Sequence, residues 1–207
     1  MNRLPVIVSV VCLIAAVLIA GATWWITRDR TGGALAPNSG RVVSTGKAAV
    51  GGPFRLVDQN GRAVDEGVLR GKWSVVFFGF TFCPDVCPTT LQALEATKAQ
   101  LGTAAKDLQV VFVTIDPERD TPPVLKAYLD SVGPKGVVGL TGTPEQVASA
   151  AKAYRVYYRK NGEGSDYTMD HSTAAYLMNP RGEFELALPY GMAPAEQARL
   201  IRGAMKQ

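Results

Sequence analysis

Cysteine and histidine are scarce in this sequence: its 207 residues include three cysteines and a single histidine. Three cysteines are too few for a disulfide-stapled scaffold, and one histidine excludes a catalytic zinc site built from three histidines. Charged residues are also few, at 19% against 47% hydrophobic residues, which excludes a wholly disordered chain. A chain of this length suits one domain with appendages.

Half of the net charge of +4 comes from the first thirty residues, which contain Arg3, Arg28, Arg30 and Asp29. The rest of the chain therefore has a net charge of +2, and it has no run of Lys and Arg. Proteins that bind nucleic acids usually gather such residues on one face. We therefore predict no nucleic-acid partner.

Residues 4–26 contain no charged side chain and include the aromatic pair Trp24-Trp25 near their end. A helix of about 20 apolar residues spans the hydrocarbon core of a membrane, and tryptophans favour its interface. The sequence therefore predicts an N-terminal transmembrane helix as an anchor over residues 1–27. Because arginines lie on both sides of this segment, the positive-inside rule does not settle its orientation.

A cleaved signal peptide is the alternative, since Ala20-Gly21-Ala22 resembles an A-x-A cleavage site. The apolar stretch is longer than a typical signal-peptide core, and the two tryptophans lie beyond that site, which favours an uncleaved anchor. Cys12 lies inside the apolar stretch, and we interpret it as a small apolar residue. Residues 28–52 are rich in Gly, Ala, Ser and Thr and predict a flexible linker.

Residues 53–207 alternate between strand-like and helix-like stretches. Asn60-Gly61 predicts a hairpin turn, and two apolar runs predict buried central strands. This alternation predicts an α/β domain that begins with a hairpin and has helices on both faces of a mixed sheet. The expected strands lie near 54–57, 62–64, 75–80, 108–115, 137–140, 172–178 and 183–188, and the expected helices near 89–101, 122–132, 144–154 and 194–205.

Both cysteines of this domain lie in the octapeptide Thr81-Phe82-Cys83-Pro84-Asp85-Val86-Cys87-Pro88, where the first buried strand meets its helix. Ligands of open α/β sheets gather at the carboxyl ends of strands, and a helix N-terminus lowers the pKa of nearby thiols. Two thiols four residues apart on a helix could bind one metal ion or form a disulfide. Thiolates favour copper(I) or zinc over calcium or magnesium. A pair of inert, buried cysteines is the structural alternative.

The single histidine, His171, lies at the start of a late strand. In thioredoxin-like domains the loop that enters this strand lies across from the cysteine-bearing helix N-terminus, so His171 could complete a site of two sulfurs and one nitrogen. Copper(I) accepts three ligands, whereas structural zinc almost always takes four. Asp170 either orients the imidazole or serves as a turn or cap residue.

A third segment, Thr114-Ile115-Asp116-Pro117-Glu118-Arg119-Asp120-Thr121-Pro122, leaves the end of the second buried strand. Asp116 is expected at the same rim of the sheet as the cysteines. Its alternative role is capping and turn formation among the acids and prolines of this segment. Arg119 is expected to pair with a neighbouring acid.

Together these three segments resemble the SCO/SenC family of copper-binding assembly factors for cytochrome c oxidase. The resemblance covers roughly residues 50–207 and the layout of anchor and tether. It rests on the family patterns T-x-C-P-D-[VI]-C-P, D-P-x-R-D-T and D-H-S, which are present here at 81–88, 116–121 and 170–172. No ligand position departs from these patterns.

The resemblance implies a thioredoxin-like fold in which Cys83, Cys87 and His171 hold one copper ion, as Cu(I) or Cu(II). It further implies a metallochaperone that delivers copper to the dinuclear copper site of oxidase subunit II, supplied by an upstream copper donor. The family's domain faces the periplasm or the intermembrane space. A short N-terminal segment without a long Arg- and Ser-rich presequence favours a bacterial inner membrane, crossed once, with the C-terminal domain in the periplasm.

Other functions fit parts of the pattern. A thiol-disulfide reductase would keep the copper-ligand cysteines of the oxidase subunit reduced, with Cys83 and Cys87 as its redox-active pair, but this function leaves His171 without a role. A peroxiredoxin-like peroxidase would use Thr81 and Cys83, yet the sequence identifies no arginine to activate the cysteine. A redox or copper sensor that acts through a partner is a further alternative.

Overall fold

The computed structural model describes residue 24 and residues 49–206. Apart from residues 24 and 49–52, the expected anchor and tether lie outside this part of the chain. None of the helices within the described residues is both long and apolar enough to cross a membrane. Residues 49–52 contact the domain, since Gly51 N donates to Ala153 O at 3.0 Å and Arg155 Nε donates to Ala49 O at 3.1 Å.

The strands of the described part begin with a hairpin and continue through two long buried strands, as the sequence predicts. They are β1 (Arg55–Asp58), β2 (Ala63–Asp65), β3 (Trp73–Gly79), β4 (Leu108–Thr114), β5 (Val138–Thr141), β6 (Tyr158–Asn161), β7 (Thr168–His171), β8 (Ala175–Met178) and β9 (Phe184–Leu188). In β3 and β4 all residues except Trp73 and Gln109 are buried, because helices cover both faces of these central strands.

Residues 49–206 also contain four α-helices and two short 3₁₀ helices. They are η1 (Glu66–Leu69), α2 (Val86–Leu101), η2 (Gly102–Asp107), α3 (Pro122–Val132), α4 (Pro144–Ala153) and α5 (Pro194–Ala204). Proline occupies the first turn of α3, α4 and α5, where its missing N–H is not needed. Thr143 and Gln146 form a capping box at the start of α4.

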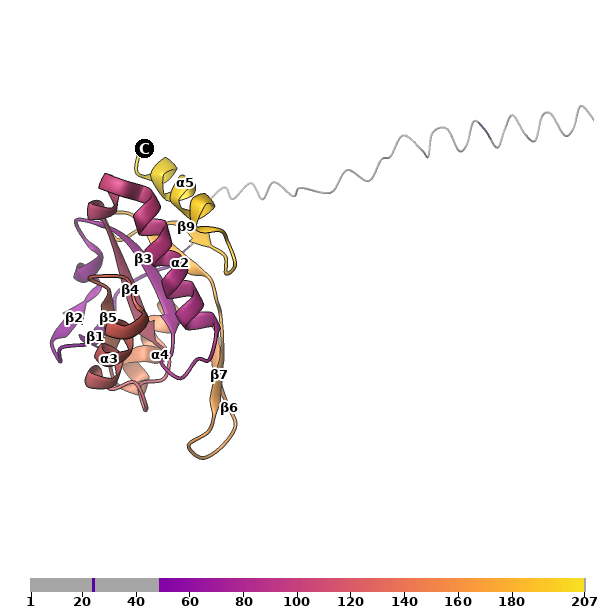
Figure 1. Ribbon diagram of the computed structural model, residues 1–207. Helices are drawn as coiled ribbons and strands as arrows, with labels where there is room; N and C mark the ends of the chain where they lie inside the picture. Colours follow the sequence, from indigo (N-terminus) through magenta and orange to yellow (C-terminus); the bar gives the residue numbers. More distant parts are fainter. Residues whose placement is uncertain (1–23, 25–48, 207) are drawn as a thin grey trace, which may run out of the picture. The chain divides into compact units, whose positions relative to one another are not determined.

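Seven strands form one mixed sheet in the order β2-β1-β5-β4-β3-β8-β9 (Figure 1). Strands β3, β4 and β5 are parallel, while β8 pairs antiparallel with both β3 and β9. The sub-order β4-β3-β8-β9, with α2 between β3 and β4 and α5 after β9, is the thioredoxin-like arrangement. The α/β fold class predicted from the sequence is therefore confirmed.

Aromatic contacts show which helices cover which face of the sheet. Phe77 and Phe112 are paired neighbours on β3 and β4, and their ring centroids lie 5.9 Å apart. Tyr128 of α3 packs against Phe112 on this face, at 6.0 Å. Phe78 points to the opposite face, where it meets Tyr154 at the end of α4 at 5.4 Å. Helices α3 and α4 therefore cover opposite faces of the sheet.

The late part of the domain differs from the expectation of one strand over 172–178. Residues 172–174 are not in a strand, and β7 ends before them at His171. Strand β7 pairs with β6 in a separate two-stranded hairpin that extends beyond the seven-stranded sheet (Figure 1). The segment Tyr158–Asn161 is mostly exposed, so it lacks the apolar alternation by which a strand is predicted.

Candidate metal centre

The two cysteines lie at the carboxyl end of β3, where the chain turns into α2. Cys83 is in the connecting segment, and Cys87 is the second residue of the helix. They therefore do not share a helical face. Instead, the backbone N–H of Cys87 donates to Cys83 Sγ at 3.4 Å, so the first turn of α2 directs a hydrogen-bond donor at this sulfur.

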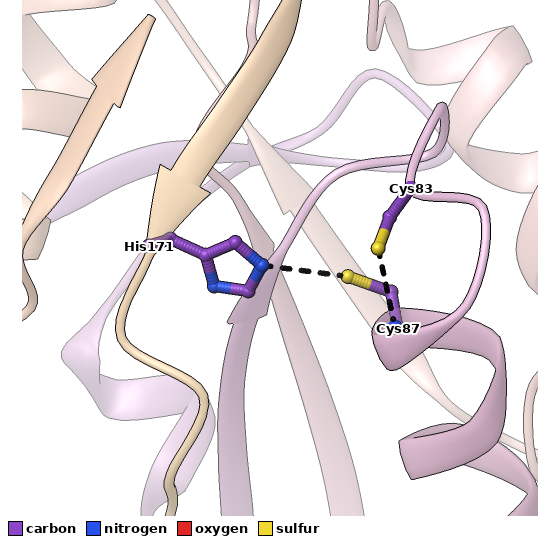
Figure 2. A group of neighbouring side chains, drawn as sticks. All are labelled: Cys83, Cys87 and His171. Atoms are coloured by element: carbon purple, nitrogen blue, oxygen red, sulfur yellow. Dashed lines mark hydrogen bonds between the residues drawn. The ribbon is translucent and has the colours of Figure 1, made fainter. Parts of the chain in front are cut away.

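The structure brings Cys83, Cys87 and His171 together, as predicted. One donor atom from each of the three lies within 4.8 Å of the other two. We call residues 80–85, which connect β3 to α2, the cysteine segment. Figure 2 shows the three side chains pointing toward one another from the cysteine segment, the start of α2 and the end of β7. Cys87 Sγ lies 3.8 Å from His171 Nε2, and both thiols are free.

The imidazole of His171 presents Nε2 to the thiols because its other nitrogen has a partner. Nδ1 lies 2.8 Å from the backbone carbonyl of Ser172. A carbonyl only accepts, so Nδ1 carries a proton, and in the neutral imidazole Nε2 then keeps a free lone pair. The ring packs edge-on against Phe80, with centroids 5.9 Å apart at 88°. This is the tautomer that a metal-binding histidine needs.

The two thiols lie in different environments. Cys87 is 0% exposed, while Cys83 is half-buried. A side-chain hydrogen bond from Cys87 is the largest cause that holds the pKa of Cys83 below its usual value, against the opposing effect of burial. The same hydrogen bond, together with burial, raises the pKa of Cys87. Cys83 is therefore the more acidic of the two thiols.

Gly79, the last residue of β3, makes room for Cys87. A Cβ atom at this position would lie 2.7 Å from Cys87 Sγ and 2.9 Å from a ring carbon of Phe112. Any side chain at residue 79 would push Cys87 away from the end of β3. The glycine is required for this close approach, since its backbone is not in the left-handed region.

Asp120 anchors the cysteine segment from the loop between β4 and α3. It is 0% exposed and accepts from Thr81 N at 3.0 Å, Thr81 Oγ1 at 2.6 Å and Thr114 Oγ1 at 2.6 Å. Burial raises the pKa of this carboxyl, and these hydrogen bonds oppose the rise. This role of Asp120 was not predicted from the sequence, although its position just after a buried strand was a usable signal.

Neither of the two acidic candidates, Asp116 and Asp170, belongs to the group of three donors. Asp116 is 3% exposed and forms an ion pair with Arg119, which confirms the expected pairing of that arginine, and it also accepts from Tyr167 Oη at 2.6 Å. Asp170 forms an exposed ion pair with Arg159 at 3.0 Å. The partner of His171 Nδ1 is therefore Ser172 O rather than the Asp170 carboxylate.

This donor set can do two kinds of chemistry. Two sulfurs and one neutral imidazole nitrogen are soft or intermediate ligands that suit Cu(I), Cu(II) or zinc. The two sulfurs also lie close enough to form a disulfide after a modest adjustment, since a disulfide needs them about 2 Å apart.

Comparison with known proteins identifies the chain's relatives. The family model described as SCO1/SenC matches residues 42–206. "Protein SCO1 homolog 1, mitochondrial" of Arabidopsis thaliana is 47% identical over 143 residues, which are 68% of this chain and 42% of that protein. "SCO2-like protein" of Rickettsia felis is 35% identical over 201 residues, covering 95% of this chain and 97% of that protein. The chain thus spans less than half of the plant relative and nearly all of the bacterial one.

A solved structure agrees with these relatives. The crystal structure of Arabidopsis thaliana ScoI with copper bound superposes with a TM-score of 0.73 at 40% identity. The match covers 77% of this chain and 99% of that one. The family model extends over most of the chain and includes both cysteines and the histidine. This chain therefore belongs to the SCO1/SenC family.

Proposed function

We propose that this chain is a membrane-anchored copper metallochaperone that binds one copper ion through Cys83, Cys87 and His171. The observation that carries the proposal is the convergence of these three donors, with the lone pair of Nε2 directed at the thiols. The copper-bound structure of the Arabidopsis relative supports the choice of metal. A three-donor set also suits Cu(I), whereas structural zinc sites use four protein ligands.

The burial of the donors favours transfer of copper over permanent storage. Cys83 and His171 are partly exposed, while Cys87 is buried against Gly79. An incoming thiolate of a partner can reach the metal from the side of Cys83 and His171 and replace these ligands first. Cys87 would then be the last ligand to release the ion.

We place this chaperone in the assembly of cytochrome c oxidase, with the dinuclear copper site of subunit II as the recipient and an upstream protein as the copper donor. The Rhodobacter capsulatus relative SenC and the mitochondrial SCO relatives support the family assignment. We further propose an anchor at residues 1–27, a linker at 28–52 and the copper-binding domain at 53–207. The anchor would hold the domain in the periplasm at a bacterial inner membrane.

Copper titration tests the proposal. The reduced full-length chain in detergent is expected to bind one Cu(I) per molecule, and Cys83→Ala, Cys87→Ala and His171→Ala are each expected to weaken binding. Incubation of the Cu(I)-loaded chain with apo subunit II should then transfer copper to the subunit, and metal analysis of the re-isolated subunit measures the copper it has gained. If His171→Ala kept wild-type affinity and Cu(II) spectra, the three-ligand site would be refuted.

A second function, thiol-disulfide reduction, is favoured by the asymmetry of the two thiols. A half-buried thiolate at Cys83 suits attack on a disulfide of the oxidase subunit, which would give a mixed disulfide and release one substrate thiolate. Cys87 would pass its proton to the released substrate thiolate and attack Cys83 Sγ. The second substrate thiolate leaves, and a Cys83–Cys87 disulfide remains.

The two functions differ in their dependence on the histidine. Reduction of an oxidised subunit II peptide by the reduced chain should fail in Cys83→Ala. A reductase should retain much of its activity in His171→Ala, whereas a chaperone should lose copper transfer in the same variant. Parallel assays of both activities on these two variants separate the functions.

A further inference from the structure

The guanidinium of Arg119 lies between two aromatic rings from different parts of the site. Its central carbon is 4.5 Å from the ring centroid of Phe82 and 3.6 Å from that of Tyr167. Phe82 directly precedes Cys83, and Tyr167 directly precedes β7, the strand that ends at His171. Arg119 therefore touches both the cysteine segment and the histidine hairpin, here defined as β6, β7 and their connecting turn.

Arg119 is held in this place by several hydrogen bonds. Its Nε pairs with Asp116 Oδ2, and its Nη1 donates to Tyr167 O at 2.9 Å. Tyr167 Oη donates to the second oxygen of Asp116 at 2.6 Å. Arg119, Asp116 and Tyr167 thus form a closed and largely buried set, whose strength comes from charge-assisted bonds and cation–π contact.

The loop that contains Arg119, residues 116–120, also contacts both ligand-bearing segments through Glu118 and Asp120, the neighbours of Arg119 in sequence. Asp120 accepts hydrogen bonds from Thr81 of the cysteine segment. Glu118 forms an ion pair with Lys160 of the histidine hairpin at 3.0 Å, and the ammonium of Lys160 also lies 3.8 Å from the ring of Tyr167. The 116–120 loop is therefore a physical bridge between the two halves of the donor set.

This bridge matters because the histidine hairpin has no ladder to the seven-stranded sheet. Backbone pairing fixes β3 and β8, but residues 172–174 separate His171 from β8, and no ladder joins β7 to the sheet. Side-chain contacts, which include the packing of the His171 ring against Phe80, therefore help to set the distance from β7 to the cysteine segment. Within the described residues, Arg119 is the one side chain with a ring contact recorded on both segments.

We propose that Arg119 is a positioning residue that holds His171 at binding distance from Cys83 and Cys87. This inference rests on the proposed copper function and adds to it a residue that touches none of the three donors. Replacement of Arg119 leaves both thiols at the end of β3 but releases the hairpin. Copper(I) would then be held by two thiolates, and the nitrogen ligand would be lost for part of the time.

Variants at Arg119 and Phe82 test this role. Arg119→Gln removes the charge, Arg119→Lys keeps the charge without the planar fork, and Phe82→Leu removes one ring. Phe82 is 59% exposed, so its replacement does not threaten the core. Arg181→Gln is the matched control, because Arg181 is exposed and pairs only locally with Glu183.

Loss of an orienting contact typically lowers metal affinity about 10–100-fold, and this is the loss of Cu(II) affinity expected for both Arg119 variants. Their Cu(II) EPR spectra should show weaker nitrogen coupling, with a smaller effect in Phe82→Leu and none in Arg181→Gln. In a His171→Ala background, Arg119→Gln should cause no further loss, because the arginine acts through the histidine.

A second readout needs no metal. In the metal-free chain, amide hydrogen exchange at residues 158–171 should be faster in both Arg119 variants, while exchange in β3 and β4 stays unchanged. If exchange and nitrogen coupling matched the wild type in Arg119→Gln, or if Arg119→Lys behaved as wild type, the proposed positioning would be refuted. If the wild type bound no copper, the proposed function would fail, and the exchange experiment would still decide whether Arg119 holds the hairpin.

Discussion

At the scale of single residues, the chemistry of this centre depends on where two protons lie. The proton on Nδ1 of His171 is held by the carbonyl of Ser172, which leaves Nε2 free to bind a metal. Of the two thiols Cys83 has the lower pKa, because the side chain of Cys87 and the first turn of α2 both donate to its sulfur. Cys83 and His171 are therefore in a form that can bind a metal ion before the ion arrives.

The lowered pKa of Cys83 predicts how the metal-free protein reacts with an alkylating reagent. An ordinary thiol, with a pKa of about 8.5, reacts faster as the pH rises toward that value. Cys83 has a pKa below the usual value, so it stays a thiolate as the pH falls, and its iodoacetamide rate should change little between about pH 6 and pH 8.

Cys87→Ala supplies the control, since the hydrogen bond from Cys87 is the largest cause of the shift. In this variant the pKa of Cys83 should return toward its ordinary value, and the alkylation rate should rise with pH. A wild-type rate that rises about tenfold per pH unit over the same range would contradict the assignment of the thiolate to Cys83.

Gly79→Ala should displace Cys87 and weaken copper binding. The added Cβ would lie 2.7 Å from Cys87 Sγ, and overpacking of this kind costs about 1–3 kcal/mol of the free energy of unfolding. Urea unfolding and Cu(I) titration measure the two effects. Gly203→Ala is the control, because a Cβ on this α5 residue would meet no atom within 4 Å. Equal effects of the two variants would argue against a packing role for Gly79.

At the scale of elements, three segments without backbone ladders between them build the centre. The cysteine segment follows β3, the 116–120 loop follows β4, and the histidine hairpin lies outside the main sheet. Because β3 and β4 are parallel neighbours, their carboxyl ends meet at one edge, which brings Asp120 to Thr81. The 116–120 loop thus links the elements that carry the donors.

Asp120→Asn tests the link between β3 and β4. Asparagine has one acceptor oxygen, and its NH2 group would face hydrogen-bond donors that now meet a carboxylate. Buried hydrogen-bonding groups left without partners cost about 1–3 kcal/mol, so the free energy of unfolding should fall by this amount in chemical denaturation. Asp130→Asn, at an exposed ion pair of α3, should change stability little. A stable Asp120→Asn with unchanged copper affinity would show that Asp120 is not needed.

The elements also show the limits of prediction from the pattern of residues. The strands β3 and β4 were predicted because they are continuous apolar runs, and α3, α4 and α5 because proline precedes their helical spacing. The cysteine pair was expected on one helical face, yet Cys83 precedes α2 and its sulfur accepts from the first turn. The hairpin β6–β7 was missed, because Arg159, Lys160 and Asn161 are exposed and follow no apolar period.

At the scale of the whole molecule, residues 49–52 are in contact with the domain proposed to begin at residue 53. Gly51 donates to Ala153, and a Cβ at Gly51 would lie 2.9 Å from Met178 Cε, so this stretch is packed against the domain. The sequence placed these four residues in the linker, since small residues and glycines dominate them. Because residues 49–52 contact the domain, truncation before and after these residues can locate the start of the domain.

Removal of residues 1–48 should leave the free energy of unfolding of the domain unchanged. Removal of residues 1–52 should lower it by about 1–3 kcal/mol, the usual net value of two lost hydrogen bonds, because the bonds from Gly51 to Ala153 and from Arg155 to Ala49 are removed. Chemical denaturation of the two truncated chains measures the difference. Equal stabilities would show that residues 49–52 add nothing.

The same truncation tests the proposed anchor. The full chain expressed in a bacterium should sediment with membranes and resist extraction by salt, whereas the chain without residues 1–48 should stay in the aqueous fraction. A full-length product that appears in the aqueous fraction, shortened near Ala20-Gly21-Ala22, would instead support cleavage of a signal peptide.

The sequence by itself predicted the α/β class and, through the family patterns, the three candidate donors, because apolar periodicity and short motifs are local properties. Only the tertiary structure decided which atoms face one another. The room made by Gly79 and the bridge through Arg119 depend on groups in separate elements, and the approach of His171 to Cys87 joins residues that are 84 positions apart. Parallel pairing of β3 and β4 sets the edge at which the cysteine segment meets the 116–120 loop, and no local pattern encodes that contact.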